Sequence, residues 1–440
     1  MRKSLRRVWP LLVLVALLLS GCAVTGADEF YTLPRRSSTY LELQRAIDST
    51  MTDKGYAAPV SGNNRRAIQT ADLDGDGVDE VLVFARARTG EKPLKVHVFQ
   101  QENDAYSLLC TIENDGAAFD SVQYVQIDGA PGMEIVLSCR LTGQILQALN
   151  VYRLQGERMD ELLHAGCTAY TVTELNGDGL SDVITLSYVA DRTNGIASYF
   201  RWRESEMLRS GEADISGSPE SVKRIITGNV AENVPAVFVA SAYDENNIVT
   251  DVFVAPADGV FSNVSLTDAN DLSTSTVRSY YVYSTDIDGD GVIELPQTKT
   301  LSAISSDPAS RDQSCIIWYN LRPDGTHEDK LTTYHNYDEG WYLVMDDDWR
   351  TTMSVTKRTD ETLGQYTCFL LSDYVSRYEF LRVYVLSGAT ATEALESGSV
   401  ILLSRRGDTY YCAALGKDVQ MEAGELQERF GFISTDTLPQ

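Results

Sequence analysis

The sequence predicts a mainly β protein, organised as a β-propeller of five to seven blades and followed by a small C-terminal α+β unit. Two observations carry this prediction. A unit of about 50 residues recurs through the middle of the chain, and each copy joins a turn-forming loop to β-branched, alternating strands. With 440 residues, 43% of them hydrophobic and 23% charged, the composition is that of a globular protein with more than one core.

The recurring unit begins with a short signature. Three copies are well formed and start at Asp72, Glu174 and Asp286, each reading acid-x-(Asp/Asn)-Gly-Asp-Gly before an apolar segment. Two degraded copies, starting at Gln126 and Gly228, fill the gaps, so that the five starts lie about 50 residues apart. This regular spacing indicates that each copy is one structural unit.

A predicted strand recurs at a matching position in every unit. The five strand-like segments are residues 94–99, 149–154, 198–202, 251–254 and 315–321. They are rich in β-branched and aromatic residues, and polar turns follow most of them. A unit of this length with about four strands is typical of a propeller blade, because one such sheet cannot bury both faces alone.

The acidic loops predict calcium sites. Side-chain oxygens at positions 1, 3, 5 and 9, with the carbonyl of position 7, are able to surround one calcium ion, and glycine at position 6 permits the sharp turn. The expected ligands are Asp72, Asp74, Asp76, Glu80 and the Val78 carbonyl in the first loop; Glu174, Asn176, Asp178, Asp182 and the Leu180 carbonyl in the second; and Asp286, Asp288, Asp290, Glu294 and the Val292 carbonyl in the third. We expect two or three structural calcium ions.

Two other interpretations of the loops were weighed. An EF-hand or dockerin loop needs an acid at position 12 and a helix afterwards, whereas these loops have Val83, Thr185 and Gln297 there. A plain Asp-Gly turn without metal leaves several carboxylates close together and uncompensated. The degraded copies are expected to be metal-free, since one has Ala130 at position 5 and the other has no acid at position 9.

With these motifs, residues 62–340 resemble the FG-GAP/VCBS repeat family. The resemblance implies a β-propeller whose inter-strand loops are stabilised by calcium. Family members serve as adhesion, ligand-binding or scaffold modules, and only some are attached to enzymes. The whole chain looks like the bacterial lipoproteins of this type.

The N-terminus predicts export and a lipid anchor. Residues 1–21 combine a basic start with an apolar run too short for a permanent membrane span, and Leu19-Ser20-Gly21-Cys22 resembles a lipobox. Cys22 is therefore the expected lipidation site, which places the protein on the extracytoplasmic side of a bacterial cell membrane. An ordinary signal peptide with an accidental cysteine is the alternative. Residues 22–37 are read as a linker.

The net charge indicates which classes of partner are disfavoured, and the cysteine pattern indicates whether disulfides are expected. The chain carries 37 Lys and Arg against 63 Asp and Glu, a net charge of −26, which disfavours nucleic acid as a partner. The six cysteines after Cys22 lie in separate strand-like contexts, so buried free thiols are favoured over disulfides. They show no zinc-type spacing.

The remaining segments complete the expected domain organisation. Residues 38–61 form a helix and lead-in whose apolar face contains Leu43, Ile47 and Met51; residues 62–340 form the propeller. Residues 341–440 form the α+β unit or a divergent final blade.

The chain shows no GxSxG, HExxH or P-loop pattern. The acidic and aromatic cluster at residues 341–349 is read as a solvated turn flanked by core aromatics, with sugar stacking as the alternative. The function expected is recognition or scaffolding of a surface protein or glycan without catalysis. The alternative is an exported hydrolase acting on polysaccharide, with the repeats as its scaffold.

Overall fold

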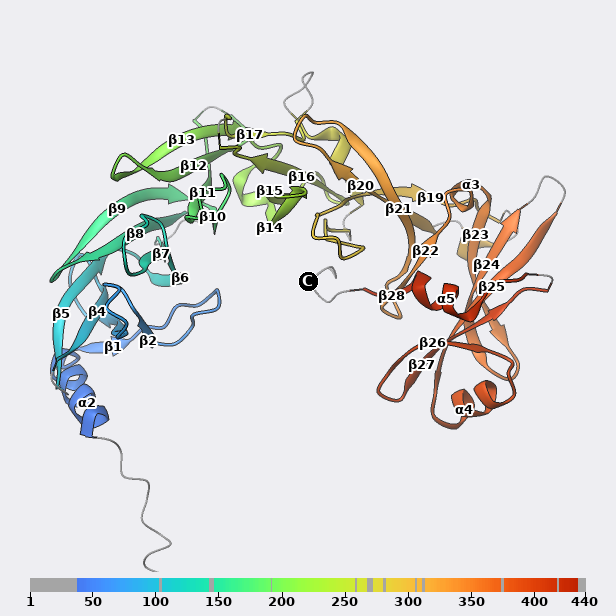
Figure 1. Ribbon diagram of the computed structural model, residues 1–440, viewed down its shortest axis with the longest axis horizontal. Helices are drawn as coiled ribbons and strands as arrows, with labels where there is room; N and C mark the ends of the chain where they lie inside the picture. Colours follow the sequence, from blue (N-terminus) through green and yellow to red (C-terminus); the bar gives the residue numbers. More distant parts are fainter. Residues whose placement is uncertain are drawn as a thin grey trace, which may run out of the picture.

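The computed structural model describes residues 38–433, except for 103–104, 142–145, 191, 258, 267–271, 280–281, 305–306, 311–312, 373–375 and 418. The signal segment and Cys22 therefore lie outside the described residues. The described part is mainly β and contains six antiparallel sheets of four or five strands. In Figure 1 the sheets follow one another in sequence order along an open arc, with the first and sixth sheets at its two ends. The predicted mainly β fold is confirmed.

The first three sheets share one plan, in which consecutive strands pair as antiparallel neighbours. Their strands are β1 (Lys54–Tyr56), β2 (Ile68–Ala71), β3 (Glu80–Ala87), β4 (Leu94–Glu102) and β5 (Ala105–Asn114); β6 (Ala118–Val125), β7 (Glu134–Arg140), β8 (Gln147–Gln155) and β9 (Arg158–Cys167); and β10 (Ala169–Thr173), β11 (Asp182–Ser187), β12 (Ile196–Arg203) and β13 (Glu206–Asp214). In the first sheet, β1 and β2 both pair with β3.

The last three sheets vary this plan. Their strands are β14 (Val222–Ala231), β15 (Val234–Ala242), β16 (Asn247–Val254), β17 (Ser262–Asn263) and β18 (Arg278–Ser279); β19 (Leu295–Thr300), β20 (Ser314–Leu321), β21 (His327–Asn336), β22 (Trp341–Met345) and β28 (Phe430–Phe432); and β23 (Met353–Asp360), β24 (Gly364–Ser372), β25 (Arg377–Ser387), β26 (Ile401–Arg406) and β27 (Thr409–Leu415). The helices are α2 (Ser38–Thr50), α3 (Trp349–Thr352), α4 (Gly388–Glu396) and α5 (Ala423–Arg429).

The sequence repeat has a structural counterpart. In each of the first three sheets, the signature loop joins two paired neighbouring strands. These are β2 and β3, β6 and β7, and β10 and β11. The recurring strand-like segments are β4, β8, β12, β16 and β20, the central strands of their sheets. The third well-formed loop precedes β19, where a single bridge between Thr285 and Glu294 replaces the strand found before the other loops.

Each apolar core lies between two successive sheets. Side chains alternate along the strands, so Ile135 and Leu137 of β7 pack toward the first sheet while Val136 packs toward the third. The same division holds in β15, where Val237 faces the third sheet and Phe238 the fifth. Both faces of the inner sheets are thus buried against neighbours, which explains the continuous apolar segments of β7 and β15.

Helices cover the two outermost faces of the arc. Ile47 of α2 packs with Val81, Val83 and Phe99 on the free face of the first sheet, as the predicted amphipathic helix requires. At the other end, α4 contributes Ala391 to the core on the outer face of the sixth sheet. An open stack of sheets needs such caps, because each end would otherwise expose a full apolar face.

The C-terminal segment returns to the fifth sheet. Strand β28 pairs with β22, matching Phe432 with Trp341 and Phe430 with Leu343. Strand β22 in turn pairs with β21, so the fifth sheet continues past the expected domain boundary at residue 340. One shared core joins the fifth and sixth sheets.

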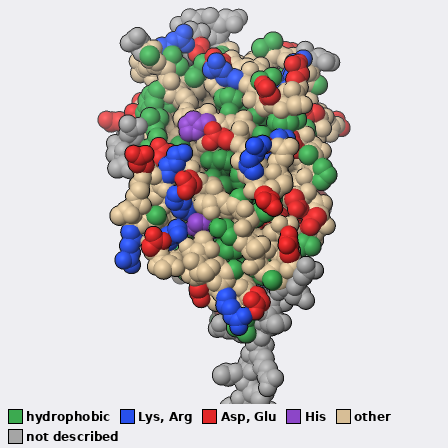
Figure 2. Space-filling model, turned by 90° about the vertical axis from the view of Figure 1, so that its left-hand side faces the viewer, with side chains coloured by type: hydrophobic (Ala, Val, Ile, Leu, Met, Phe, Trp, Pro, Cys, Tyr) green, Lys and Arg blue, Asp and Glu red, His purple; other side chains and the backbone are tan. Residues whose placement is uncertain are grey.

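The surface and the helices show further general features. Figure 2 shows acidic and basic side chains interspersed over the face at the outer side of the early sheets. None of the helices in the described part of the chain is both long and apolar enough to cross a membrane.

Candidate metal loops and ligand cavity

Three carboxylates converge in the first acidic loop. One oxygen each of Asp72, Asp74 and Glu80 lies within 4.8 Å of the others. The backbone N–H groups of Gly75 and Gly77 donate to the two oxygens of Asp72 over 2.7 and 3.1 Å. Both glycines have positive φ angles, 77° and 88°, which glycine adopts at little steric cost. The turn that gathers the carboxylates therefore depends on these glycines.

The acid at position 9 of this loop is buried. Glu80 is 2% exposed, and its Oε2 accepts a hydrogen bond from the backbone N–H of Leu73 over 2.9 Å. Burial raises the pKa of Glu80 to about 7, and the negative charges of Asp74, Asp76 and Asp72 add to the rise. A set of hard oxygen donors around an uncompensated buried carboxylate fits calcium.

The third loop gathers a different set of three carboxylates, at positions 1, 3 and 5 instead of 1, 3 and 9. Carboxylate oxygens of Asp286, Asp288 and Asp290 lie within 4.8 Å of one another. The N–H groups of Gly289 and Gly291 donate to Asp286 over 2.7 and 2.9 Å, matching the contacts of the first loop. At position 9, Glu294 is fully buried and its Oε1 has no hydrogen-bond partner among the described residues. This orphaned oxygen and the three converging carboxylates fit a bound cation.

A lysine already compensates part of the charge in the third loop. The Nζ of Lys330 on β21 lies 2.6 Å from Asp290 Oδ2 and 3.2 Å from Asp288 Oδ2. Its hydrogen bond lowers the pKa of Asp290. In the described part of the chain, no lysine or arginine forms an ion pair with the acids of the first loop. The two loops therefore differ in how much charge remains for a metal ion.

The second loop is arranged differently. Its acids, Glu174, Asp178 and Asp182, are not among the converging carboxylate groups found in the described residues. Asp182 instead accepts hydrogen bonds from the side-chain amide of Asn176 and from the hydroxyl of Tyr199, at 3.2 and 3.0 Å. Burial raises the pKa of Asp182 to about 7. Protein donors thus occupy oxygens that the sequence assigns to calcium.

One backbone contact recurs in all three loops. The residue at position 7 donates its N–H to the carboxylate at position 5: Val78 to Asp76 over 2.7 Å, Leu180 to Asp178 over 2.9 Å, and Val292 to Asp290 over 2.9 Å. This contact sets the bend at the end of each loop. The contact involves the N–H group of the position-7 residue and not its carbonyl, so the binding of calcium by that carbonyl stays a prediction.

In the first degraded loop, an arginine from strand β8 pairs with the acid at position 3. Nη1 of Arg153 on β8 donates to Asp128 Oδ2 over 2.8 Å, and the Asp128 side chain is only 1% exposed. The backbone contact to the position-9 acid survives, since Ile127 N–H donates to Glu134 over 2.6 Å. Burial raises the pKa of Glu134 to about 7. A guanidinium thus neutralises a buried acid in a loop that lacks the acid at position 5.

Neighbouring loops are connected by backbone hydrogen bonds. Met133 donates to the Asp72 carbonyl over 3.0 Å, and Ser181 donates to the Gln126 carbonyl over 2.8 Å. The second degraded copy forms the β14–β15 hairpin, and its Asn229 carbonyl accepts from Ile293 in the third loop over 2.8 Å. The loops therefore couple successive sheets through the backbone.

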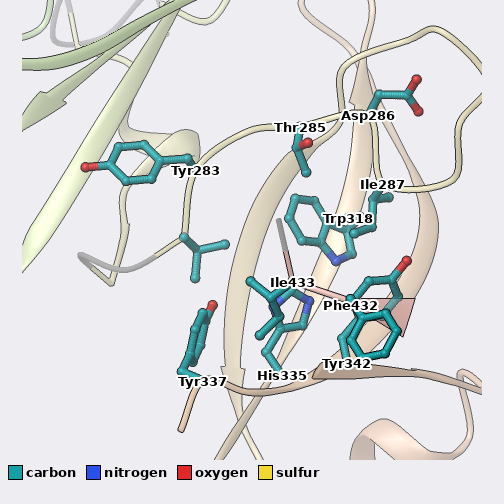
Figure 3. Close-up of a pocket in the computed structure, with 11 residues that line it drawn as sticks. Tyr283, Thr285, Asp286, Ile287, Trp318, His335, Tyr337, Tyr342, Phe432 and Ile433 are labelled. Carbon is teal, nitrogen blue, oxygen red and sulfur yellow. The ribbon is translucent and has the colours of Figure 1, made fainter. Parts of the chain in front are cut away.

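A cavity of about 100 Å³ lies beside the third loop. Aromatic side chains dominate its wall, and Figure 3 shows them around the imidazole of His335. The wall residues used below are Tyr283, Asp286, Trp318, His335, Tyr337, Tyr342 and Phe432. Tyr342 stacks on His335 with ring centroids 5.3 Å apart, and Tyr337 approaches it from another side at 5.5 Å. The Tyr337 ring is tilted by 49° against the imidazole, so these rings form an angled aromatic wall.

His335 is the unusual polar group of this cavity. Neither ring nitrogen is accessible to solvent or hydrogen-bonded to a described residue. Burial lowers the pKa of His335 to about 3, so its ring is neutral near pH 7. Figure 3 shows the Asp286 carboxylate directed away from the imidazole. The site therefore offers a neutral donor and acceptor without an acid that orients it for proton transfer.

A second, more polar cavity of about 360 Å³ shares His335 and Tyr337 with the first. Hydroxyl, amide and charged side chains line it, including Thr298, Gln313, Ser314, Asn336, Asp338 and Lys357. Lys357 Nζ lies 2.5 Å from Asp338 Oδ2, so these two charges are paired. Apolar rings thus stand next to an array of hydrogen-bonding groups.

The acidic and aromatic cluster at residues 341–349 divides between core and surface. Trp341 is fully buried and Trp349 is 8% exposed, while Asp346 and Asp347 pair with Arg429 and Arg350. This agrees with a solvated turn flanked by core aromatics. The six cysteines after Cys22 are unpaired in the structure, and all but Cys110 are buried.

Comparisons with known proteins place the chain in no family. No family model and no curated protein matches it. Among solved structures, a Bacillus licheniformis rhamnogalacturonan lyase shares 12% identity, covers 74% of this chain and 71% of its own, and has a TM-score of 0.25. An exotype rhamnogalacturonan lyase, YesX, shares 10% identity over 75% of this chain and 72% of its own, with a TM-score of 0.26. Likeness at these TM-scores assigns neither fold nor activity.

Proposed function

We propose that this protein is a saccharide-recognition module, held on the extracytoplasmic face of a bacterial membrane and stabilised by calcium. The paired cavities around His335 carry this proposal. One presents aromatic rings and the other presents hydroxyl and amide groups, and the two meet at His335 and Tyr337. Sugars have both an apolar C–H face, which packs on aromatic rings, and hydroxyls that need donors and acceptors.

The buried imidazole contributes to this recognition. Both nitrogens of the neutral His335 lack a partner among the described residues and are closed to solvent, so the imidazole gives or accepts a hydrogen bond with a sugar hydroxyl only when the cavity opens around the sugar. A hydrogen bond to this buried imidazole adds specificity, because a ligand without the matching hydroxyl leaves the imidazole unpaired. The site works by binding, and no step of bond cleavage is assigned to it.

The experiment is a screen of neutral oligosaccharides with the mature chain in calcium, followed by titration of each hit. Tryptophan fluorescence gives the readout, because Trp318 lines the cavity. We expect Tyr337→Ala to weaken binding about tenfold or more, a loss of about 1.4 kcal/mol. Tyr378→Ala is the matched control, since Tyr378 has similar exposure and lies outside both cavities. Equal effects of the two variants, or no hit in the screen, would refute the proposal.

The repeated sheets provide the scaffold for this site. We infer that the six sheets are the blades of an open, propeller-like arrangement, supported by the repeat spacing, the shared strand plan and the helices that cover both ends. Calcium in the first and third loops would then brace successive blades through the contacts between loops. The lipid on Cys22 would hold the arc near the membrane surface, and Cys22→Ser should release the protein into the soluble fraction.

A further inference from the structure

A second cleft, of about 400 Å³, lies far from the His335 cavities in the sequence. It is formed by the segment that connects β1 to β2, by β2 itself and by β6. The lining residues are Asn63, Asn64, Arg65, Arg66, Ile68, Gln69, Thr70 and Tyr124. Figure 1 shows this connection, in blue, reaching from the first sheet toward the inside of the arc. Most of the side chains that line the cleft are polar or charged.

The connecting segment is held in place by the second sheet. Ser61 N–H donates to the carbonyl of Asp120 over 2.8 Å, and the side-chain amide of Asn64 donates to the carbonyl of Val122 over 3.2 Å. Gln69 also holds the segment, because its side-chain amide donates a hydrogen bond to the carbonyl of Arg66 over 2.7 Å. The cleft wall is thus fixed before any ligand arrives, which reduces the entropy cost of binding.

The same glutamine links the segment to the opposite wall. Its Oε1 accepts a hydrogen bond from the hydroxyl of Tyr124 over 2.8 Å, and its Nε2 also donates to the Asn64 carbonyl over 3.1 Å. Tyr124, Gln69 and the arginine-bearing backbone therefore form one connected unit. A ligand in the cleft meets a tyrosine ring on one side and amide groups on the other.

The arginines of the cleft have no acidic partner. Nε of Arg65 donates to the Gly62 carbonyl over 2.8 Å, which orients the guanidinium and leaves its two terminal nitrogens unused. Within the described residues, neither Arg65 nor Arg66 forms an ion pair. The carboxylate of Asp120 is instead taken by Arg140 over 2.6 Å and by Ser61 over 2.9 Å. Two adjacent unpaired arginines are notable in a chain of net charge −26.

We propose that this cleft binds the carboxylate of an acidic sugar, a uronic acid, independently of the His335 cavities. The fork of Arg65 matches a planar carboxylate with two parallel hydrogen bonds, and Arg66 adds a second positive charge. The side chains of Asn63 and Asn64 then face the sugar hydroxyls, and the ring of Tyr124 faces its C–H groups. A single negative charge also suits a strongly acidic protein better than a doubly charged phosphate does.

The test compares D-glucuronate, D-glucose and inorganic phosphate as ligands of the mature full-length chain, by calorimetry or ligand-observed NMR. We expect glucuronate to bind about tenfold or more tightly than glucose, and 1 M salt to weaken it because exposed charges are then screened. Arg65→Gln and Arg66→Gln should each raise its dissociation constant several-fold. Arg88→Gln, which removes an exposed arginine outside the cleft, should leave it unchanged.

The outcomes separate this site from the proposed function. Tyr337→Ala should not affect glucuronate binding, so either site is able to fail alone. Equal binding of glucose and glucuronate, or equal effects of Arg65→Gln and Arg88→Gln, would overturn the proposal. Phosphate binding as tightly as glucuronate and with the same dependence on Arg65 would also overturn it, because the cleft would then be a general oxyanion site. An unchanged melting temperature of each variant confirms that the fold is intact.

Discussion

Arg153 donates a hydrogen bond to Asp128 over 2.8 Å, inside a loop that has kept the shape of the acidic loops but lost the acid at position 5. The loops form a series. The first has no described basic partner, the third has Lys330 on two of its acids, and the degraded loop has the half-buried guanidinium of Arg153. Protein cations therefore compensate acids in two of these loops, and calcium is the counter-charge that we propose for the first loop.

Loss of Arg153 should destabilise the fold. Arg153→Met leaves Asp128 without its charge partner, and because Arg153 is half-buried the cost lies between about 1 kcal/mol for an exposed pair and about 3–5 kcal/mol for a buried one. Arg158→Met, which removes the solvent-exposed partner of Asp160, should cost about 1 kcal/mol or less. Urea unfolding measures both values. Adding Asp128→Asn to Arg153→Met should restore part of the lost stability, whereas similar losses for the two single variants would contradict this role.

Calcium should stabilise the protein through the first loop. At a hundredfold excess over its dissociation constant, one ion that binds only the folded state adds about 2.7 kcal/mol. Chelation should therefore lower the melting temperature by several degrees, and magnesium should restore little of it. Asp74→Ala should remove most of this response, because Asp74 belongs to the converging group.

The degraded loop supplies the control for this experiment. Asp128→Ala should lower stability with and without calcium by the same amount, because Arg153 already occupies that loop. A melting curve that does not change on chelation, or a calcium response lost equally in the Asp74 and Asp128 variants, would show that the loops are plain turns.

Lys330 should compete with calcium in the third loop. Removing its ammonium with Lys330→Met frees Asp288 and Asp290, so calcium affinity at this loop should rise about tenfold or more. Calorimetry in an Asp74→Ala background isolates the third loop. Lys299→Met is the control, because Lys299 is exposed and carries the same charge. Identical calcium affinities in the Lys330 and Lys299 variants would rule out competition.

His335 should make stability depend on pH. Burial lowers its pKa to about 3, below the ordinary value of 6.5, so the unfolded chain takes up a proton that the folded chain refuses. Its contribution is therefore complete above pH 6.5 and declines as the pH falls from 6.5 toward 3, by about 1.4 kcal/mol per pH unit.

A difference measurement isolates this effect from the buried carboxyl groups, whose raised pKa values act in the opposite direction. The free energy of unfolding of wild type minus that of His335→Gln should fall with acidification between pH 6 and 4. Parallel curves for wild type and His335→Gln would contradict the burial of a neutral imidazole.

Local sequence patterns predicted much of the fold because they depend on near neighbours. The alternation in residues 94–99 and 149–154 marks strands that are buried on both faces, and the helical spacing of Leu43, Ile47 and Met51 marks the face that packs on the first sheet. The acidic loops were equally readable as places where carboxylates gather, since the converging acids of the first and third loops lie within nine residues of one another, whereas their role as calcium ligands stays a prediction.

The cations and the ligand sites required the tertiary structure. Lys330 pairs with Asp290, 40 residues away in the sequence, and Arg153 pairs with Asp128, 25 residues away. The sequence of neither segment indicates which strands pair, so it does not predict these contacts. His335 is buried by Tyr342 and by Phe432 of the returning C-terminal strand, a neighbour nearly a hundred residues away in the sequence. Period and spacing thus determined strands, loops and the buried face of α2, whereas sheet register and the packing of distant segments decided which charges are paired and where the cavities lie.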